Sequence, residues 1–303
     1  MRLNSKVVVA GFSALSLWGW ATESYATSQA LPGITTGIVT SALPPEGIYN
    51  IVDVNWGARG PYNGGPEVDL GVGVPIHPLW VTPFQILGGR VFFHEQNVWS
   101  QVGIGNGFGH TAANLRGYAT TELGTGASWT LGNGFHAAIQ EAVYAPANSE
   151  VSLRDYWSFQ QKFMFGYLTP EWALNVEVLG GPGRDGPLQN VAPANVAFGQ
   201  PATAGAAWGN LNLTALKRFG KLEFGLVGFG STDLSSPYTG YKRESQFALG
   251  GALGYDFEAV KVVAKLTRDV YQQNEGGYET RAWGILIFPL WRPEAPKAVI
   301  AKY

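Results

Sequence analysis

Short segments in which apolar residues alternate with polar or very small ones recur along this chain from Glu46 onward. Each is ~9–14 residues long, and about a dozen are present, all without the 3.6-residue period of an amphipathic helix. In segment 259–269, for example, Val262 and Leu266 alternate with Lys265. A period of two is that of a β-strand with one apolar and one polar face, so the chain is predicted to be all-β.

The connections between the predicted strands alternate in length. Short ones, such as 76–78 and 131–133, alternate with long ones, of which 94–114 and 181–205 are the longest. Short turns on one rim and long loops on the other, with both ends of the barrel at the short-turn rim, are typical of a transmembrane antiparallel β-barrel with periplasmic termini. We interpret the two longest loops as gates or plugs. The predicted strands number twelve: 46–57, 67–75, 79–93, 115–130, 134–145, 156–168, 171–180, 206–217, 221–231, 245–257, 259–269 and 278–290.

A sheet with an apolar outer face must close on itself in lipid, because an open edge would leave backbone groups unpaired. A barrel of about twelve strands is wider than the eight-stranded barrels that side chains fill, and narrower than the 16–18-stranded porins. We therefore expect a narrow, selective or plugged passage. Aromatic residues beside the short turns are expected to point outward as an interfacial belt: Trp80, Trp129, Phe135, Tyr167, Trp172, Phe219, Tyr255, Phe257, Phe288 and Trp291.

The N-terminus has the pattern of a cleavable secretory signal peptide. Arg2 and Lys6 precede a mostly apolar stretch that is too short to span a bilayer, and Ser24-Tyr25-Ala26 forms a small-x-small cleavage site. Cleavage is expected after Ala26, with Ala30 as the alternative. The predicted organisation is a signal peptide at 1–26, a periplasmic N-terminal segment at 27–45, an outer-membrane β-barrel at 46–291 and a C-terminal tail at 292–303.

Composition excludes several other classes. The chain has no cysteine, which rules out disulfides and thiolate metal sites. Its formal net charge of −2 gives no basic surface for nucleic acid. The four histidines, His77, His94, His110 and His136, lack the spacing of metal ligands, and no serine is placed to pair with His136 as a nucleophile. We therefore expect no metal, no cofactor and no catalytic residues.

Polar residues on the inward faces of the predicted strands are the candidate lining of the lumen. Charged side chains facing lipid at mid-depth are costly, so these residues should point inward. They could form a selectivity lining, or a salt-bridge network that fills the barrel. The candidates are Arg116, Tyr118, Glu122, His136, Gln140, Gln160, Lys162, Asn175, Glu177, Asn210, Asn212, Glu223, Lys261, Lys265, Glu279 and Arg281.

The ordered motifs of the mature chain resemble the meta-pathway phenol degradation family of outer-membrane β-barrel proteins, which has chlorophenol-catabolism-associated members. The resemblance covers most of the region after the signal peptide, and it implies a porin-like or transporter-like barrel that passes hydrophobic or aromatic compounds. The motifs are Pro45-Glu46-Gly47-Ile48-Tyr49, Ile86-Leu87-Gly88-Gly89-Arg90, Trp129-Thr130-Leu131-Gly132-Asn133-Gly134-Phe135-His136, Val143-Tyr144-Ala145-Pro146, Phe224-Gly225-Leu226-Val227-Gly228, Ala248-Leu249-Gly250, Gly254-Tyr255-Asp256-Phe257 and Phe288-Pro289-Leu290.

The sequence thus predicts a bacterial outer-membrane channel for passive uptake of small hydrophobic or aromatic compounds. Its expected partners are outer-membrane lipid, the transported solute and the barrel assembly machinery. The alternative is a structural or adhesion barrel with a filled lumen and binding loops, and a barrel hydrolase is the third class considered.

Overall fold

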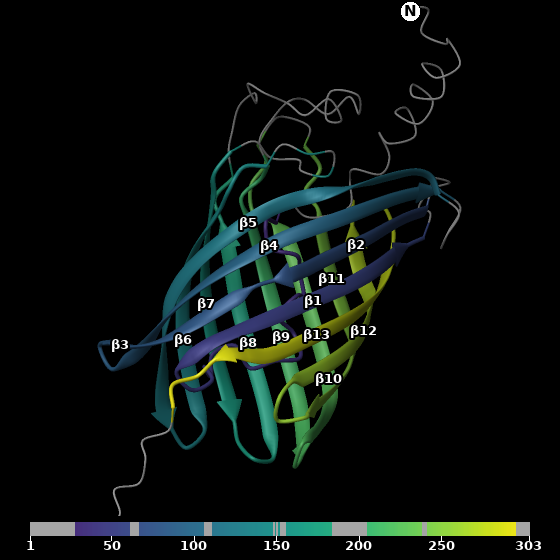
Figure 1. Ribbon diagram of the computed structural model, residues 1–303. Coiled ribbons are helices and arrows are strands. Elements are labelled where there is room, and N and C mark those ends of the chain that lie inside the picture. The colour runs from purple at the N-terminus through teal and green to yellow at the C-terminus, as the bar shows by residue number, and fades with distance from the viewer. Residues whose placement is uncertain are drawn as a thin grey trace, which may run out of the picture.

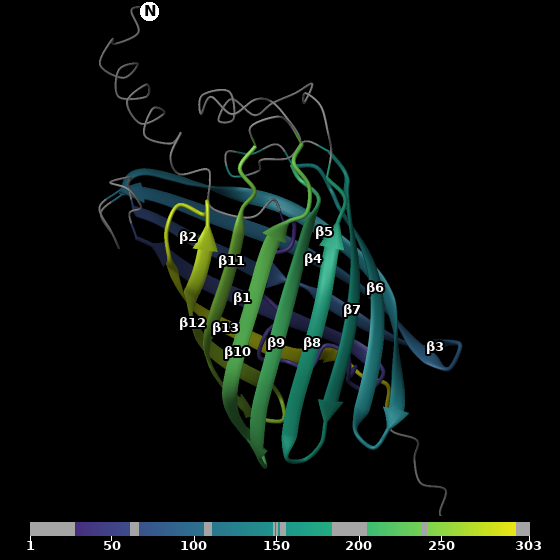
Figure 2. The ribbon, with the colours of Figure 1, turned by 180° about the vertical axis from the view of Figure 1, so that it is seen from behind.

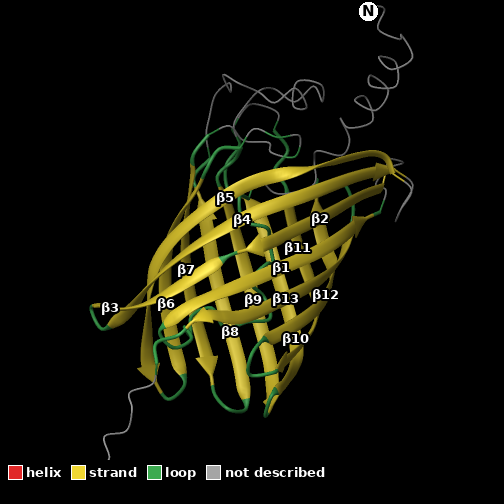
Figure 3. Cartoon of the chain, viewed as in Figure 1, coloured by secondary structure: helices red, strands yellow, loops and turns green. Residues whose placement is uncertain are grey.

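The chain forms one continuous β-sheet that is rolled into a barrel (Figures 1 and 3). The computed structural model describes residues 28–60, 67–105, 111–147, 149, 151, 156–183, 205–237 and 241–294. The predicted signal peptide lies outside these residues, as do most of the predicted loop 181–205 and the end of the C-terminal tail. The strands are β1 (Gly47–Arg59), β2 (Glu67–Ile76), β3 (Pro78–Ile86), β4 (Gly89–Gly105), β5 (Thr111–Gly132), β6 (Phe135–Tyr144), β7 (Ser158–Leu168), β8 (Trp172–Gly181), β9 (Trp208–Phe219), β10 (Leu222–Asp233), β11 (Ser245–Asp256), β12 (Lys261–Gln273) and β13 (Glu279–Trp291).

The sheet closes where its first strand meets its last. β1 pairs antiparallel with β13 along its whole length, from Ile48 opposite Trp291 to Arg59 opposite Glu279. All other neighbouring pairs are also antiparallel, and Figure 2 shows the wall continuing around the back. β2 and β3 together occupy one place in the wall, between β1 and β4. The wall therefore has twelve strand positions, and the predicted twelve-stranded antiparallel barrel is confirmed.

One predicted turn is wrong. Residues 76–78 do not reverse the chain: β2 and β3 run in the same direction and are separated only by a break at His77. Pro75 and Pro78 flank this break, and they interrupt the ladder without reversing the chain. The Asn50 side chain repairs it, because its amide donates to the Pro75 carbonyl (3.1 Å) and accepts from the His77 N–H (2.9 Å).

The true reversal lies at Leu87-Gly88, inside the predicted strand 79–93. Both residues have positive φ, 49° and 80°, as a tight two-residue hairpin of the I′ type requires. The shift lengthens the next two strands, so most of the predicted loop 94–114 belongs to β4 and β5. Only residues 106–110 separate these strands, and they lie outside the described residues. The proposed gate at 94–114 is therefore withdrawn.

The outer face of the wall is apolar. Leu226, Leu253 and Leu266 on neighbouring strands are more than half exposed, whereas the residues before and after each of them face inward or are glycines. The aromatic rings beside the short turns also point outward, as expected: Phe135 packs on Tyr167, and their ring centroids are 4.8 Å apart. No helix among the described residues is long and apolar enough to span a membrane.

A charge on this outer face should oppose insertion of the barrel into lipid. Leu226 of β10 is 71% exposed. Leu226→Arg is expected to make the barrel folded in a bilayer less stable, by ~2–4 kcal/mol. Urea titration of folding into phosphatidylcholine vesicles measures the change, with Leu226→Met as the matched control. Equal stability of the two variants would mean that this face does not contact lipid.

Candidate functional site

Residues 28–46, called here the plug segment, lie inside the barrel (Figures 1 and 2). The sequence placed residues 27–45 outside the barrel as a periplasmic segment, and the described part of that stretch instead runs along the inner face of β9 and β8. It enters near the long-loop rim and ends at the short-turn rim, where β1 begins. Four contacts mark the descent: Asn210 Nδ2 to Ser28 Oγ (2.8 Å), Gly33 N–H to Asn212 Oδ1 (3.1 Å), Gly37 N–H to Thr214 Oγ1 (2.9 Å) and Ser41 Oγ to Asn175 Oδ1 (3.0 Å).

Lys265 of β12 holds the plug segment through the segment's backbone. Its ammonium group donates to the carbonyls of Gly33 (3.0 Å), Ile34 (3.3 Å) and Thr36 (2.8 Å). It also lies 4.4 Å from the centroid of the Trp283 ring, a cation–π contact that favours the charged amine. One wall cation thus binds three carbonyls of the plug segment, of which that of Gly33 also accepts from the Thr36 N–H (3.1 Å) and hydroxyl (2.7 Å).

Glu177 of β8 holds the same segment through side chains. Its carboxylate accepts from the hydroxyls of Thr35 and Thr40, and from the Asn212 amide at 3.0 Å. The Glu177 side chain is 0% exposed, so this carboxylate is enclosed by its donors. A lone buried carboxylate would be costly, and these donors offset that cost.

The backbone of the plug segment is shaped by two glycines. Gly33 and Gly37 have φ values of +83° and +88°, which side-chain-bearing residues rarely adopt. A Cβ at Gly33 would also collide with the Phe229 ring. The sequence carries no charged residue between Glu23 and Glu46, so the only charged residue of the plug segment is Glu46, at the end that joins β1.

An apolar belt lines the inner wall beside the plug segment. It consists of one inward side chain from each of six consecutive strands, β8 to β13, and Ile38 and Val39 of the plug segment pack on it. Sequence reasoning missed this belt because its members come from six different strands, one from each. The belt residues are Ala173, Leu216, Val227, Ala252, Val263 and Ile285.

The structure places most of the predicted lining residues on the inner face, but not Arg116 or Tyr118. The Tyr118 ring packs edge-on against Trp99, which is half exposed on the outer surface. Arg116 lies two residues along the same strand and shares that face. The cause is a β-bulge between Val98 and Trp99, which reverses the alternation of β5 relative to the sequence pattern. The inward candidates are Glu122, His136, Gln140, Gln160, Lys162, Asn175, Glu177, Asn210, Asn212, Glu223, Lys261, Lys265, Glu279 and Arg281.

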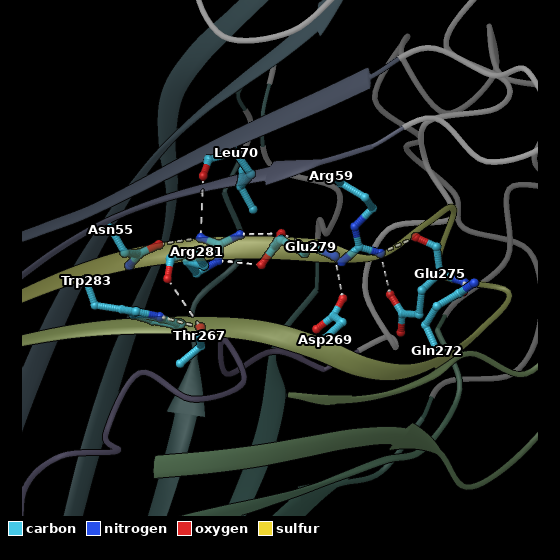
Figure 4. Close-up of polar contacts among 10 residues, drawn as sticks. All are labelled: Asn55, Arg59, Leu70, Thr267, Asp269, Gln272, Glu275, Glu279, Arg281 and Trp283. Carbon is cyan, nitrogen blue, oxygen red and sulfur yellow. Dashed lines mark hydrogen bonds and ion pairs between the residues drawn. The ribbon is translucent and has the colours of Figure 1, made fainter. Parts of the chain in front are cut away.

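Arg281 belongs to an ion network at the seam rather than to an open passage (Figure 4). Its guanidinium contacts both carboxylate oxygens of Glu279, at 2.7 and 2.8 Å, and donates to Asn55 across the β1–β13 junction. Arg59 of β1 pairs with Glu275 at 3.2 Å and with Glu279 at 3.7 Å. These groups are nearly fully buried, so they join the first strand to the last from the inside.

A second polar network covers the inner face of β4 to β7. The Glu122 carboxylate accepts from the amides of Gln140 and Gln160, both at 3.2 Å, and lies 3.8 Å from His94 Nε2. His94 in turn contacts His77 at 3.2 Å. The described residues contain no group of three His, Asp or Glu side chains arranged to hold a metal ion.

The sequence did contain a signal for the plug segment. A stretch of more than twenty residues without charge, containing two glycines and several threonines and serines, directly precedes the first strand. Such a segment suits a lumen wall rich in asparagine and threonine. The belt has no comparable signal, since it forms only when six strands are aligned.

Removing the Lys265 amine should loosen the plug segment. We expect Lys265→Met to speed amide hydrogen exchange at Gly33 and Gly37 by roughly 10- to 100-fold, because hydrogen bonds to a charged group contribute about 1.5–3 kcal/mol. Exchange is read by mass spectrometry on the reconstituted barrel. Lys261→Met is the matched control: it lies on the same strand but pairs with Glu223 instead of the plug segment. Equal exchange rates in both variants would contradict the role given to Lys265.

The fold resembles that of a solved outer-membrane channel. The COG4313 outer membrane channel from Pseudomonas putida F1 superimposes with a TM-score of 0.62 at 12% identity, covering 82% of this chain and 97% of that one. The NanC porin gives a TM-score of 0.46 at 9% identity, over 79% of this chain and 100% of that one. The transport unit of the Escherichia coli autotransporter AIDA-I gives 0.47 at 8% identity, over 93% of this chain and 98% of that one.

A search of curated proteins finds no match. A family model does match, over residues 53–283, which is most of the barrel from β1 to β13. This agrees with the resemblance seen in the sequence motifs. The chain therefore belongs to the family described as "Putative MetA-pathway of phenol degradation".

Proposed function

We propose that this barrel lies in the bacterial outer membrane and lets small hydrophobic or aromatic compounds pass, without chemistry and without a cofactor. The fold is that of an outer-membrane channel, and the family description refers to phenol degradation. The apolar outer face supports contact with lipid, and the short turns would then face the periplasm. Outer-membrane lipid and the barrel assembly machinery are its expected partners.

The apolar belt is the observation that carries the proposed solute class. A wall lined only by charges and amides would favour ions or sugars, because apolar molecules gain nothing there. Six inward aliphatic side chains on adjacent strands instead offer a surface on which an apolar ring is stabilised by about 25 cal/mol per Å² buried. Asn212, Thr214 and Asn175 lie on the same inner face and bind the plug segment here, and they could bind a polar substituent on such a ring once the segment has moved away.

The plug segment covers part of the apolar belt in this structure. Ile38 and Val39 cover the same belt that a solute would use, so passage requires the segment to move. The same observation supports a second candidate function, a structural barrel whose lumen stays filled. The two differ in whether the plug segment leaves the belt.

Solute flux into sealed liposomes tests the channel against the filled barrel. We expect phenol to enter faster than through protein-free membranes, and a sugar to remain excluded. Lys265→Met should increase phenol entry severalfold, because it frees the plug segment, whereas Lys261→Met should leave the rate unchanged. Entry of both solutes would indicate a general porin, and entry of neither in any variant would favour the filled barrel.

The cleavage site decides how much of the plug segment remains. Cleavage after Ala26 keeps Ser28 and Ala30, both of which bind Asn210, whereas cleavage after Ala30 removes both. We expect cleavage after Ala26, since the structure uses these residues. The intact mass of the protein extracted from outer membranes gives the answer, and a mass that starts at Leu31 would contradict it.

A further inference from the structure

The outer wall carries a groove that the proposed passage does not use. It has a volume of about 640 Å³ and lies across β3 to β7, which run side by side in Figure 1. Most of its lining is apolar and includes Trp80, Phe93, Leu123 and Phe159, all of which are exposed on the lipid-facing surface. Two carboxylates, Glu95 and Glu141, line the same groove.

These carboxylates are unusual for a lipid-facing surface. Glu141 is the seventh residue of β6, a ten-residue strand, which is the length that spans a bilayer. Glu95 lies opposite Leu123, beside exposed Phe93. Ionisable groups at membrane depth are costly and usually mark a functional site.

The partners of the two carboxylates leave them able to accept another donor. The Asn97 amide donates to Glu95 Oε1 at 2.8 Å, and the Gln161 amide donates to Glu141 Oε1 at 2.6 Å. Among the described residues, no lysine, arginine or histidine forms an ion pair with either carboxylate. The second oxygen of each has no described protein donor.

One residue of the inner face also lines the groove. His94 faces inward, yet it lines the groove together with Gly124, its neighbour on β5. A Cβ at Gly124 would collide with the His94 ring. This is also where β2 and β3 are interrupted at His77, so the groove lies directly outside the break in the wall.

We propose that this groove is a lipid-side binding site for phenol-type solutes. The ring would pack against Trp80, Phe93 and Phe159, and the hydroxyl would donate to Glu141 or Glu95. A hydroxyl donor suits these carboxylates, whereas an aromatic acid would be repelled by them. The assignment of the solute class rests on the proposed function, but the site itself is separate from the lumen and the belt.

Photolabelling locates the site. The full-length barrel in phosphatidylcholine vesicles is irradiated with 4-azidophenol, and labelled peptides are mapped by mass spectrometry. We expect labelling within 78–95, 123–143 and 158–165 that excess phenol suppresses. The matched probe 4-azidotoluene lacks the hydroxyl and should label these peptides roughly tenfold less, since a hydrogen bond to a charged acceptor is lost.

Variants test the role of the carboxylates. Glu95→Leu with Glu141→Leu should lower groove labelling by 4-azidophenol to the level of 4-azidotoluene. Glu171→Leu, at a short turn outside the groove, should leave it unchanged. The heat-dependent shift in gel mobility checks that each variant forms a barrel, and the single variant Glu141→Gln provides a milder change if the double variant does not fold.

The outcomes separate this site from the proposed function. Labelling confined to peptides that carry the belt residues, or equal labelling of the groove by both probes, would overturn the groove site while the channel stands. Phenol-suppressed groove labelling in vesicles that show no phenol flux would support the site and overturn the channel. Phenol flux is measured in the same preparation, so the two results are read independently.

Discussion

The barrel depends on the pairing of its first strand with its last. An apolar outer face is stable in lipid only if every backbone N–H and C=O in the wall has a partner, and the β1–β13 ladder removes the last free edges. The ion network of Arg59, Glu275, Glu279 and Arg281 reinforces this junction from the inside. Glu279 and Arg281, which the sequence predicts to line the lumen, thus help to hold the first and last strands together.

Much of the fold was predictable because barrel strands obey a period of two. The alternation gave the strand class and the number of wall positions, and the aromatic residues beside the turns lie outward as expected. Errors arose where local chemistry broke the period. The break at His77, predicted to be a turn, is an interrupted strand bridged by the Asn50 side chain, and a bulge at Val98 and Trp99 places Tyr118 on the outer face.

The interior was less predictable than the wall. Inward polar residues such as Glu177 and Lys265 were identified by strand register, but their partners are in a segment that has no regular period. Lys265 binds backbone carbonyls, which every residue possesses. Its contacts therefore cannot be predicted from the types of the residues involved. The apolar belt likewise depends on the stagger of six strands, a property of the closed ring and not of any one segment.

The path of the plug segment has a consequence for assembly order. The segment descends the lumen and joins β1 at Gly47, and β1 then climbs back along the wall as one side of the seam. A ring closed beforehand would require these residues to be drawn lengthwise through a lumen already narrowed by the belt. If the sheet instead curls around the segment, and β13 pairs with β1 as the last step, the segment is enclosed without having to pass through the lumen. The segment can then act as a template around which the barrel forms.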